Sequence, residues 1–123
     1  MSYFRLGVVM AKCIFCKMVE GEIKPDVVYE DEDVLAFRDT NPQSPTHVLL
    51  IPKQHIATTN DLDEGNAAIV GRLYLAARQV AANEGIAERG YRMVMNCNPE
   101  AGQSVYHIHL HLLGGRPMNW PPG

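Results

Sequence analysis

Three histidines, His107, His109 and His111, alternate with aliphatic residues near the end of this 123-residue chain. In a β-strand successive side chains point to opposite faces, so this spacing predicts three imidazoles on one face, with Ile108 and Leu110 toward the core. A lone histidine is most often an ordinary core or surface residue, but strict alternation with aliphatic residues indicates a functional site. Such a row suits either metal binding or acid–base and nucleophilic chemistry.

Metal binding by all three histidines is disfavoured by the geometry of a strand. His107 and His111 are four residues apart, which is about 13 Å in an extended chain. The ligands of one metal ion lie within about 4 Å of each other, because metal–nitrogen bonds are roughly 2.0–2.1 Å long. A straight strand therefore supplies two of these histidines to one ion, but scarcely all three.

The alternative is covalent and acid–base catalysis on a phosphate group. A neutral imidazole is a good nucleophile near neutral pH, and a neighbouring histidine can carry or donate a proton. Just upstream, Ala101-Gly102-Gln103-Ser104 is a turn of small residues entering the strand. Backbone N–H groups of such turns bind phosphate oxygens, and the Ser104 hydroxyl adds a further donor. The pattern therefore favours phosphate chemistry.

Short β-prone segments separated by turn residues position these groups. The acidic turn 30–33 makes a hairpin of the first two segments, and Pro52 ends the third. The predicted strands cover residues 27–29, 34–37, 47–51, 91–96 and 105–113.

Two helices complete the predicted elements. A short helix over residues 13–20 is closed by Gly21 in a left-handed conformation. The long helix lies between about Asp61 and Glu84, with Asn60 or Asp61 as its cap and Gly85 at its end. Its apolar face consists of residues at helical spacing, namely Ile69, Leu73, Ala76 and Val80.

The order of elements predicts an α+β fold. Three strands, one long helix and two strands do not alternate as a parallel α/β fold requires. We expect a mostly antiparallel five-stranded sheet with one long helix and a short N-terminal helix. Residues 13–123 form the single predicted domain. Residues 1–12 are expected to be an N-terminal extension, because Met10 can itself be a start.

Composition and charge exclude two broad classes of function. Eleven Lys and Arg against fourteen Asp and Glu give a net charge of −3, without the basic footprint of a nucleic-acid-binding protein. No apolar run approaches the roughly 18 residues of a membrane-spanning helix. The three cysteines are an odd number, which argues against a disulfide framework and favours a cytoplasmic location. An anionic ligand must therefore be held by a local site.

The segment from Gly102 to Arg116 resembles the signature of the histidine triad family, in which three histidines alternate with apolar residues. The resemblance runs from Cys13 to the C-terminus and is closest to the nucleotide-binding branch of small homodimeric purine nucleoside phosphoramidases. It implies the histidine triad fold and hydrolysis of the P–N bond of adenosine or guanosine 5′-phosphoramidates to AMP or GMP. Earlier blocks match in order: Cys13-Ile14-Phe15-Cys16-Lys17, Ala36-Phe37-Arg38-Asp39, Pro45-Thr46-His47 and Ile51-Pro52-Lys53.

The resemblance implies four catalytic residues. His109 would attack the α-phosphorus and form a nucleotidyl-histidine, which water then hydrolyses to the nucleoside monophosphate. His111 would donate a proton to the leaving nitrogen, and Ser104 would contact the phosphate and that nitrogen. His47 would belong to the hydrogen-bond network that orients the His109 ring. These steps require no metal.

The resemblance also implies a purine nucleotide site. Phe15, Met18 and Phe37 would form the apolar slot for the base, and Asp39 would accept hydrogen bonds from the ribose hydroxyls. At Thr40 the chain departs from relatives, which often carry an aliphatic residue there. The other residues implied for this site are Asn96, Gly102, Gln103, Ser104, His109, His111 and Trp120.

A structural zinc site is possible as well. Cys13-x-x-Cys16 has the spacing of zinc-binding thiolates, although the pair alone is ambiguous because other cysteines share it. Some family members complete the site with a histidine after the Ile-Pro-Lys block and with the first triad histidine, which here are His55 and His107. These four residues would form a closed tetrahedral site that stabilises the fold and takes no part in catalysis.

A homodimer is expected, with residues 91–96 or their neighbours pairing across a twofold axis to remove a sheet edge. In relatives the C-terminal tail approaches the partner subunit's site, which is the role implied for Trp120. Two alternative functions stay open: a dinucleoside polyphosphate hydrolase or nucleotidyl transferase of the same superfamily, and a nucleotide-binding interaction protein. The short tail and the Gly114-Gly115-Arg116 ending favour the phosphoramidase over the first alternative.

Overall fold

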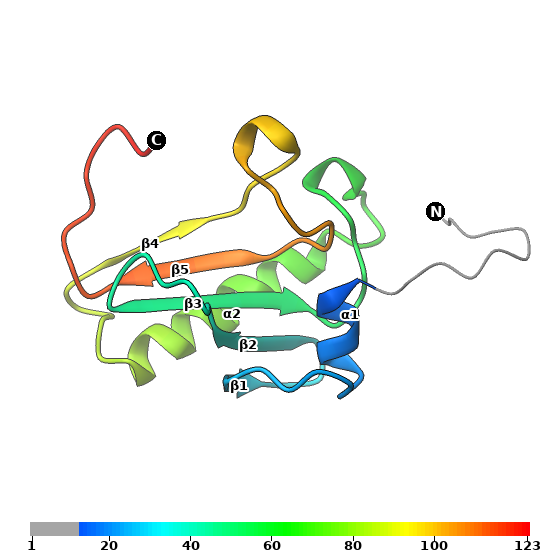
Figure 1. The fold of residues 1–123 in the computed structure, drawn as a ribbon, viewed down its shortest axis with the longest axis horizontal. Coiled ribbons are helices and arrows are strands. Elements are labelled where there is room, and N and C mark those ends of the chain that lie inside the picture. Colours follow the sequence, from blue (N-terminus) through cyan, green and yellow to red (C-terminus); the bar gives the residue numbers. More distant parts are fainter. Residues whose placement is uncertain (1–12) are drawn as a thin grey trace, which may run out of the picture.

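The computed structural model describes residues 13–123, and the predicted extension, residues 1–12, lies outside the described residues. The described chain folds into one antiparallel sheet with a helix on each face (Figure 1). The helices are α1 (Ile14–Val19) and α2 (Ala68–Asn83). The strands are β1 (Val27–Glu30), β2 (Val34–Arg38), β3 (Thr46–Pro52), β4 (Tyr91–Val94) and β5 (Leu110–Gly114). The predicted α+β class and five-stranded sheet are confirmed.

The strands follow the order β1-β2-β3-β5-β4, so β1 and β4 form the two edges of the sheet. The predicted hairpin is present, because β1 and β2 pair antiparallel. In the centre, β3 pairs with β5 from Thr46↔Gly114 to Leu50↔Leu110. This register brings the middle of β3 beside the histidine-bearing strand.

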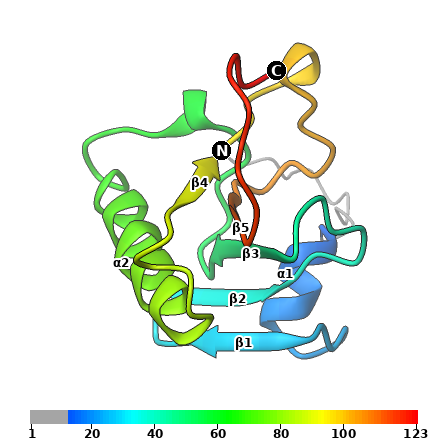
Figure 2. The same ribbon diagram turned by 90° about the vertical axis from the view of Figure 1, so that its left-hand side faces the viewer.

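The two helices cover opposite faces of the sheet (Figure 2), and alternation of side chains along the central strands gives the sheet a core on each face. On the α2 side, Val48 and Leu50 pack against Leu73, and the predicted helix face is confirmed because Ala76 and Val80 are buried there as well. Odd-numbered residues point the other way, and those buried against Phe15 of α1 are Leu35, Phe37, Leu49 and Ile51. Positions 39, 47, 109 and 111 continue these odd-numbered rows, so functional side chains gather on the α1 face.

The long helix begins later than predicted, at Ala68 in place of Asp61. Asp61 belongs to a capping box with Thr58 around the 3₁₀ turn Thr59–Asp61, and Asp63 accepts the backbone N–H of Gly65. The predicted cap is therefore wrong, and α2 starts without a side-chain cap. Its end is as predicted, because Gly85 follows in the left-handed region with φ 75°. Neither helix in the described part of the chain has the length and apolar character needed to cross a bilayer.

The last strand is also shorter than predicted and begins at Leu110 in place of residue 105. The backbone before it makes hydrogen bonds outside the sheet. The N–H of Ile108 donates to the carbonyl of Ile56 at 2.7 Å, and the carbonyl of His107 accepts from the His109 ring at 2.8 Å. The three histidines therefore span the start of β5, with His111 in the ladder and His107 before it. Similarly, β4 ends at Val94 and not at residue 96.

Candidate active site and metal cluster

His109 is buried on the α1 face just before β5. Its Nδ1 lies 2.8 Å from the main-chain carbonyl oxygen of His107. A carbonyl only accepts hydrogen bonds, so Nδ1 carries the proton and Nε2 keeps a free lone pair. The ring also packs edge-on against Phe15, with the centroids 5.2 Å apart. The local backbone therefore holds His109 in the tautomer that a nucleophilic imidazole requires.

His47 and His111 form a hydrogen-bonded pair beside it. Nε2 of His47 is 2.9 Å from Nδ1 of His111, and the backbone N–H of Gln43 donates to Nδ1 of His47 at 3.0 Å. Because Nδ1 of His47 accepts, its proton is on Nε2 and is donated to His111. His111 must then carry its own proton on Nε2. The centroid of the His111 ring is 5.2 Å from that of His109, so a neutral N–H donor lies next to the buried imidazole of His109.

Burial keeps this pair uncharged. It lowers the pKa of His47, and it lowers the pKa of His111 to about 4, with the neighbouring His109 and His47 adding to the effect. Asp39 opposes both shifts, and its Oδ2 is 3.4 Å from Nε2 of His47. Desolvation is the larger influence, so both rings are neutral near pH 7.

The residues expected to hold the purine form an apolar wall that reaches His109 through Phe15. Phe15 and Phe37 meet edge-on with centroids 5.5 Å apart, and Met18 packs on the same cluster. Both phenylalanines are also core residues of the α1 face. Asp39 follows β2 and lies beside His47, where its Oδ1 accepts the backbone N–H of Asn41. These four residues therefore occur together with the triad.

The loop expected to bind phosphate precedes β5. Gly102 adopts φ 89° at the end of the 3₁₀ turn Pro99–Ala101, and Gly102 and Ser104 are exposed. Gln103 is buried, and its side-chain amide donates to the carbonyls of Ala57 and Val105 and accepts the N–H of Asn98. The amide of Gln103 is thus used to shape the loop. The resemblance implied that Gln103 lies along the phosphate, and it gave no indication of this structural use of the amide.

The two remaining residues predicted to bind the nucleotide, Asn96 and Trp120, make fewer contacts with the rest of the site. Asn96 follows β4 and is half-buried. Trp120 lies on the C-terminal tail with 81% of its surface exposed, and the guanidinium of Arg92 sits 5.8 Å from its ring. Within one chain Trp120 therefore projects into solvent and packs only against Arg92 among the described contacts.

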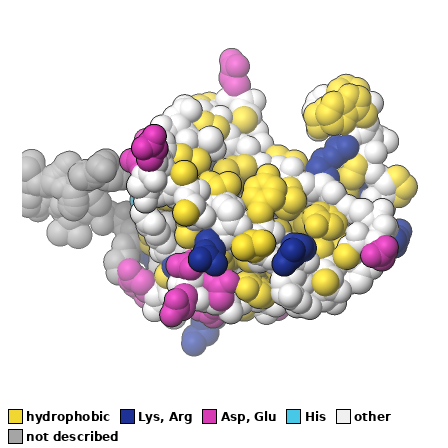
Figure 3. Space-filling view, turned by 180° about the vertical axis from the view of Figure 1, so that it is seen from behind, with side chains coloured by type: hydrophobic (Ala, Val, Ile, Leu, Met, Phe, Trp, Pro, Cys, Tyr) yellow, Lys and Arg dark blue, Asp and Glu magenta, His cyan; other side chains and the backbone are white. Residues whose placement is uncertain are grey.

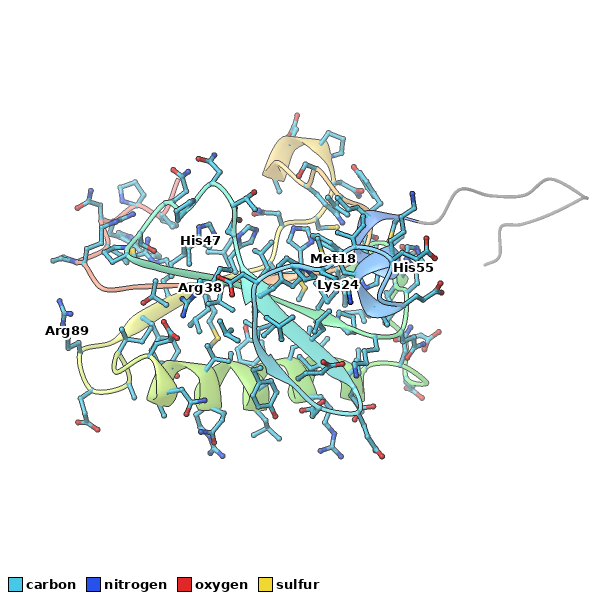
Figure 4. All side chains as sticks on the ribbon, turned by 60° about the horizontal axis from the view of Figure 1, so that its bottom comes forward. Met18, Lys24, Arg38, His47, His55 and Arg89 are labelled. Atoms are coloured by element: carbon cyan, nitrogen blue, oxygen red, sulfur yellow. The ribbon has the colours of Figure 1, made fainter. Side chains whose placement is uncertain are left out.

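A second cluster joins α1 to the triad. The side chains of Cys13, Cys16, His55 and His107 place their ligand atoms within 4.8 Å of one another. The distances between Nδ1 of His107 and the other three atoms are 3.3 Å to Cys13, 3.6 Å to Cys16 and 3.2 Å to His55. Figure 4 shows that this cluster is separate from the histidine pair, because His55 lies beside α1 while His47 lies near Arg38.

The four residues fit a tetrahedral zinc ion. With typical bond lengths, nitrogen and sulfur ligands of zinc are about 3.3–3.8 Å apart. The hydrogen bonds agree: Nε2 of His107 is 2.8 Å from the carbonyl of Pro52 and donates to it, which leaves Nδ1 unprotonated toward the cluster. In the absence of an ion, burial raises the pKa of the Cys16 thiol to about 12, with Cys13 contributing. Binding of a cation would have to displace that proton.

A second group of possible metal ligands, Asp39, His47 and His111, is equally compact. Here the hydrogen bonds oppose a metal. The N–H of Gln43 occupies Nδ1 of His47, so the neutral ring carries its proton on Nε2, the atom that would face the ion. These residues therefore form a proton-bearing pair with a carboxylate beside it. The ring protons of His47 and His107 are positioned by two main-chain groups, the N–H of Gln43 and the carbonyl of Pro52. Sequence analysis missed these groups, because no pattern of side chains indicates them.

Comparison with known proteins agrees with this geometry. The HIT domain matches residues 20–118. The chain is 52% identical over 105 residues to the purine nucleoside phosphoramidase of Escherichia coli (strain K12), covering 85% of this chain and 88% of that protein. It is 56% identical over 112 residues to the 14 kDa zinc-binding protein of Zea mays, covering 89% and 87%. The crystal structure of a HIT family hydrolase from Legionella pneumophila Philadelphia 1 has a TM-score of 0.89 and 54% identity, covering 91% of this chain and 100% of that one.

The antiparallel sheet carries a hydrogen-bonded pair of histidines beside the buried ring of His109, an arrangement suited to imidazole chemistry. The chain belongs to the HIT domain family, as its resemblance to the histidine triad signature implied.

Proposed function

We propose that this chain is a purine nucleoside phosphoramidase, which hydrolyses adenosine or guanosine 5′-phosphoramidates to AMP or GMP and a free amine. The observation that carries the proposal is the tautomer of His109, whose Nε2 is left free by the hydrogen bond from Nδ1 to the His107 carbonyl. The name and 52% identity of the Escherichia coli relative support the substrate class.

In the first step the Nε2 lone pair of His109 attacks the α-phosphorus while the P–N bond breaks, which forms a nucleotidyl-histidine. The departing nitrogen needs one proton to leave as a neutral amine, and Nε2–H of His111 supplies it. The ring of His109 becomes positively charged as it takes the phosphoryl group. Loss of the Nε2 proton leaves a negative charge on His111. The positive ring of His109, whose centroid is 5.2 Å from that of His111, offsets this negative charge.

In the second step water attacks the phosphorus and its proton passes to His111. The bond between phosphorus and Nε2 of His109 then breaks, and both histidines return to their starting states. Over the two steps one water is consumed, its hydrogen ending on the amine and its hydroxyl on the nucleotide. Holding the nucleophile in place contributes on the order of 7–11 kcal/mol, and proton donation about 10²–10⁴-fold.

We assign the nucleotide contacts as the sequence suggested them. Phe15, Met18 and Phe37 hold the base, and Asp39 offers its Oδ2 to the ribose, because its Oδ1 already accepts the N–H of Asn41. The phosphate is bound by His109, His111 and the exposed loop before β5, with contributions from Asn96, Gly102, Gln103 and Ser104.

A homodimer is part of the proposal. The edge strand β4 is unpaired on its outer side in the described chain and can pair with a second copy. Hydrophobic side chains also gather over the outer surface of α2 (Figure 3), where Tyr74 is 46% and Leu75 52% exposed. The exposed Trp120 would then contact the partner's nucleotide site, which gives this side chain a function.

Zinc in the cysteine cluster would be structural, because the atoms that react belong to His109 and His111. The three cysteines are unpaired, which supports a reducing, cytoplasmic location.

The proposal is tested by AMP release from an adenosine 5′-phosphoramidate, with Cys97→Ser as a control outside the site. We expect His109→Ala to lose at least about 10³-fold in kcat and to retain AMP binding, while the control matches wild type. Chelation should leave the rate of folded wild type intact. A wild type that cleaves diadenosine polyphosphate faster than phosphoramidate would support the nucleotidyl transferase alternative. A wild type inactive on both would support the interaction protein.

A further inference from the structure

Arg116, which follows Gly115 just after the end of β5, reaches the loop between β2 and β3. Its Nε and Nη2 donate to the main-chain carbonyl of Gln43 at 3.3 Å and 3.0 Å. The N–H of the same residue, Gln43, donates to Nδ1 of His47. One residue of the main chain thus connects the Arg116 guanidinium to the histidine pair.

The N–H of Gln43 determines the direction of the hydrogen bond inside the pair. Two neutral imidazoles share two protons among four nitrogens, so two arrangements exist. With Nδ1 of His47 accepting from Gln43, His47 donates to His111, and His111 presents Nε2–H to the substrate. In the reverse arrangement His111 donates from Nδ1 to His47, and its Nε2 is bare. Only the first arrangement gives the leaving nitrogen a donor.

Within the loop, Asp39 accepts the N–H of Asn41 and Ser44 donates to the carbonyl of Thr46, while the carbonyl of Gln43 is held from outside the loop by Arg116. Gln43 is exposed and lies between Pro42 and Pro45, and its side chain bonds only to the neighbouring carbonyl of Asn41 among the described residues. Gly115 brings the end of β5 against this loop, because a Cβ at Gly115 would lie 2.8 Å from Cβ of Pro45. The backbone of the C-terminal segment therefore approaches the loop closely, which allows the side chain of Arg116 to donate to the carbonyl of Gln43.

We propose that Arg116 is a positioning residue that fixes the direction of the His47–His111 hydrogen bond by holding the main chain of Gln43. Its effect on rate rests on the proposed phosphoramidase activity, but its effect on the two rings does not. The other charged or titratable groups facing the pair are Asp39 from the end of β2 and His109 beside β5. Neither bonds to Nδ1 of His47, so neither replaces the N–H of Gln43.

The direct test is ¹⁵N NMR of the full-length ¹⁵N-labelled chain, which distinguishes protonated from unprotonated ring nitrogens. In wild type we expect His111 to be protonated at Nε2 and His47 at Nε2. Arg116→Ala should shift His111 toward the Nδ1–H form, and Arg116→Lys, which keeps one donor, should restore part of the wild-type pattern. Arg89→Ala is the matched control, because that arginine is exposed and extends into solvent at the same end of the molecule (Figure 4).

Kinetics give a second readout through the leaving group. Arg116→Ala should lower kcat for an adenosine phosphoramidate of an alkylamine about tenfold, a part of the usual value of proton donation, with little change in KM. The p-nitrophenyl ester of AMP releases an anion that needs no proton, so its kcat should fall less than about twofold. A merely structural role would lower both rates together.

The outcomes are distinct. Altered ring tautomers with a selective loss on the phosphoramidate support the proposal. Wild-type tautomers in Arg116→Ala, or equal losses on both substrates, overturn it. If wild type hydrolyses neither substrate, the proposed function fails, and the NMR comparison with Arg89→Ala still decides whether Arg116 orients the pair.

Discussion

Removing the proposed zinc ion from the cysteine cluster should cost this protein about 4 kcal/mol of unfolding free energy. The cluster connects Cys13 to His107, which are 94 positions apart. A cross-link that closes a loop of about 100 residues stabilises a fold by about 4.7 kcal/mol in the chain-entropy treatment. Linkage gives a similar figure, because a free ion at about 1,000 times its dissociation constant contributes about 4.1 kcal/mol. For a chain of this size that corresponds to roughly 15 °C in melting temperature.

The assay is thermal unfolding of one preparation, first loaded with zinc, then treated with chelator, then reloaded. We expect the chelated protein to melt about 15 °C lower and the reloaded protein to recover. A Cys13→Ser/Cys16→Ser variant should melt low throughout, whereas Cys97→Ser should behave as wild type. A difference below about 3 °C between loaded and chelated wild type would refute the reasoning, as would an equal shift in the double variant.

Three further changes are predicted from the site and its supports. Burial lowers the pKa of His111 from 6.5 to about 4, so its contribution to stability is complete above pH 6.5 and is lost as the pH falls toward 4. After allowance for partial exposure, the lost unfolding free energy is about 1–2 kcal/mol. In urea unfolding, the stability of His111→Gln should therefore fall less on acidification than the stability of wild type. Gly115→Ala should cost about 1–3 kcal/mol in denaturant unfolding, since φ is 92° and the new Cβ would press on Pro45. Arg38→Ala, which removes a two-pronged contact with Glu84 at 2.9 and 3.0 Å, should cost roughly 1 kcal/mol by urea titration, and a loss below about 0.2 kcal/mol would contradict it.

The sheet and its faces could be predicted from the sequence because they depend on alternation and on turn residues. Ile108, Leu110 and Leu112 are buried as alternation requires, and the hairpin follows the acidic turn. Helix and strand boundaries were harder. Asp61 and Asp63 look like first-turn residues of a helix, yet their side chains close turns ahead of it, because a carboxylate caps whichever N–H groups come near.

The sequence indicated the residue types of the candidate site, but it did not indicate which ring nitrogens carry protons. The histidine spacing indicated imidazole chemistry, and resemblance to a family supplied the four members of the metal cluster, which the structure brings together. The ring tautomers depend on the carbonyls of His107 and Pro52 and the N–H of Gln43. Every residue type has a carbonyl and nearly every one an N–H, so only tertiary structure shows which of them meets a ring.

His107 takes part in two interactions, one through its side chain and one through its main chain. Its imidazole belongs to the proposed metal cluster, while its main-chain oxygen accepts the ring proton of His109. Substitution at this position can delete the ring and can never delete the oxygen. A lineage could therefore lose the proposed metal site by mutation while the tautomer of His109 is inherited with the path of the backbone, which makes that tautomer more robust to mutation than the cluster beside it.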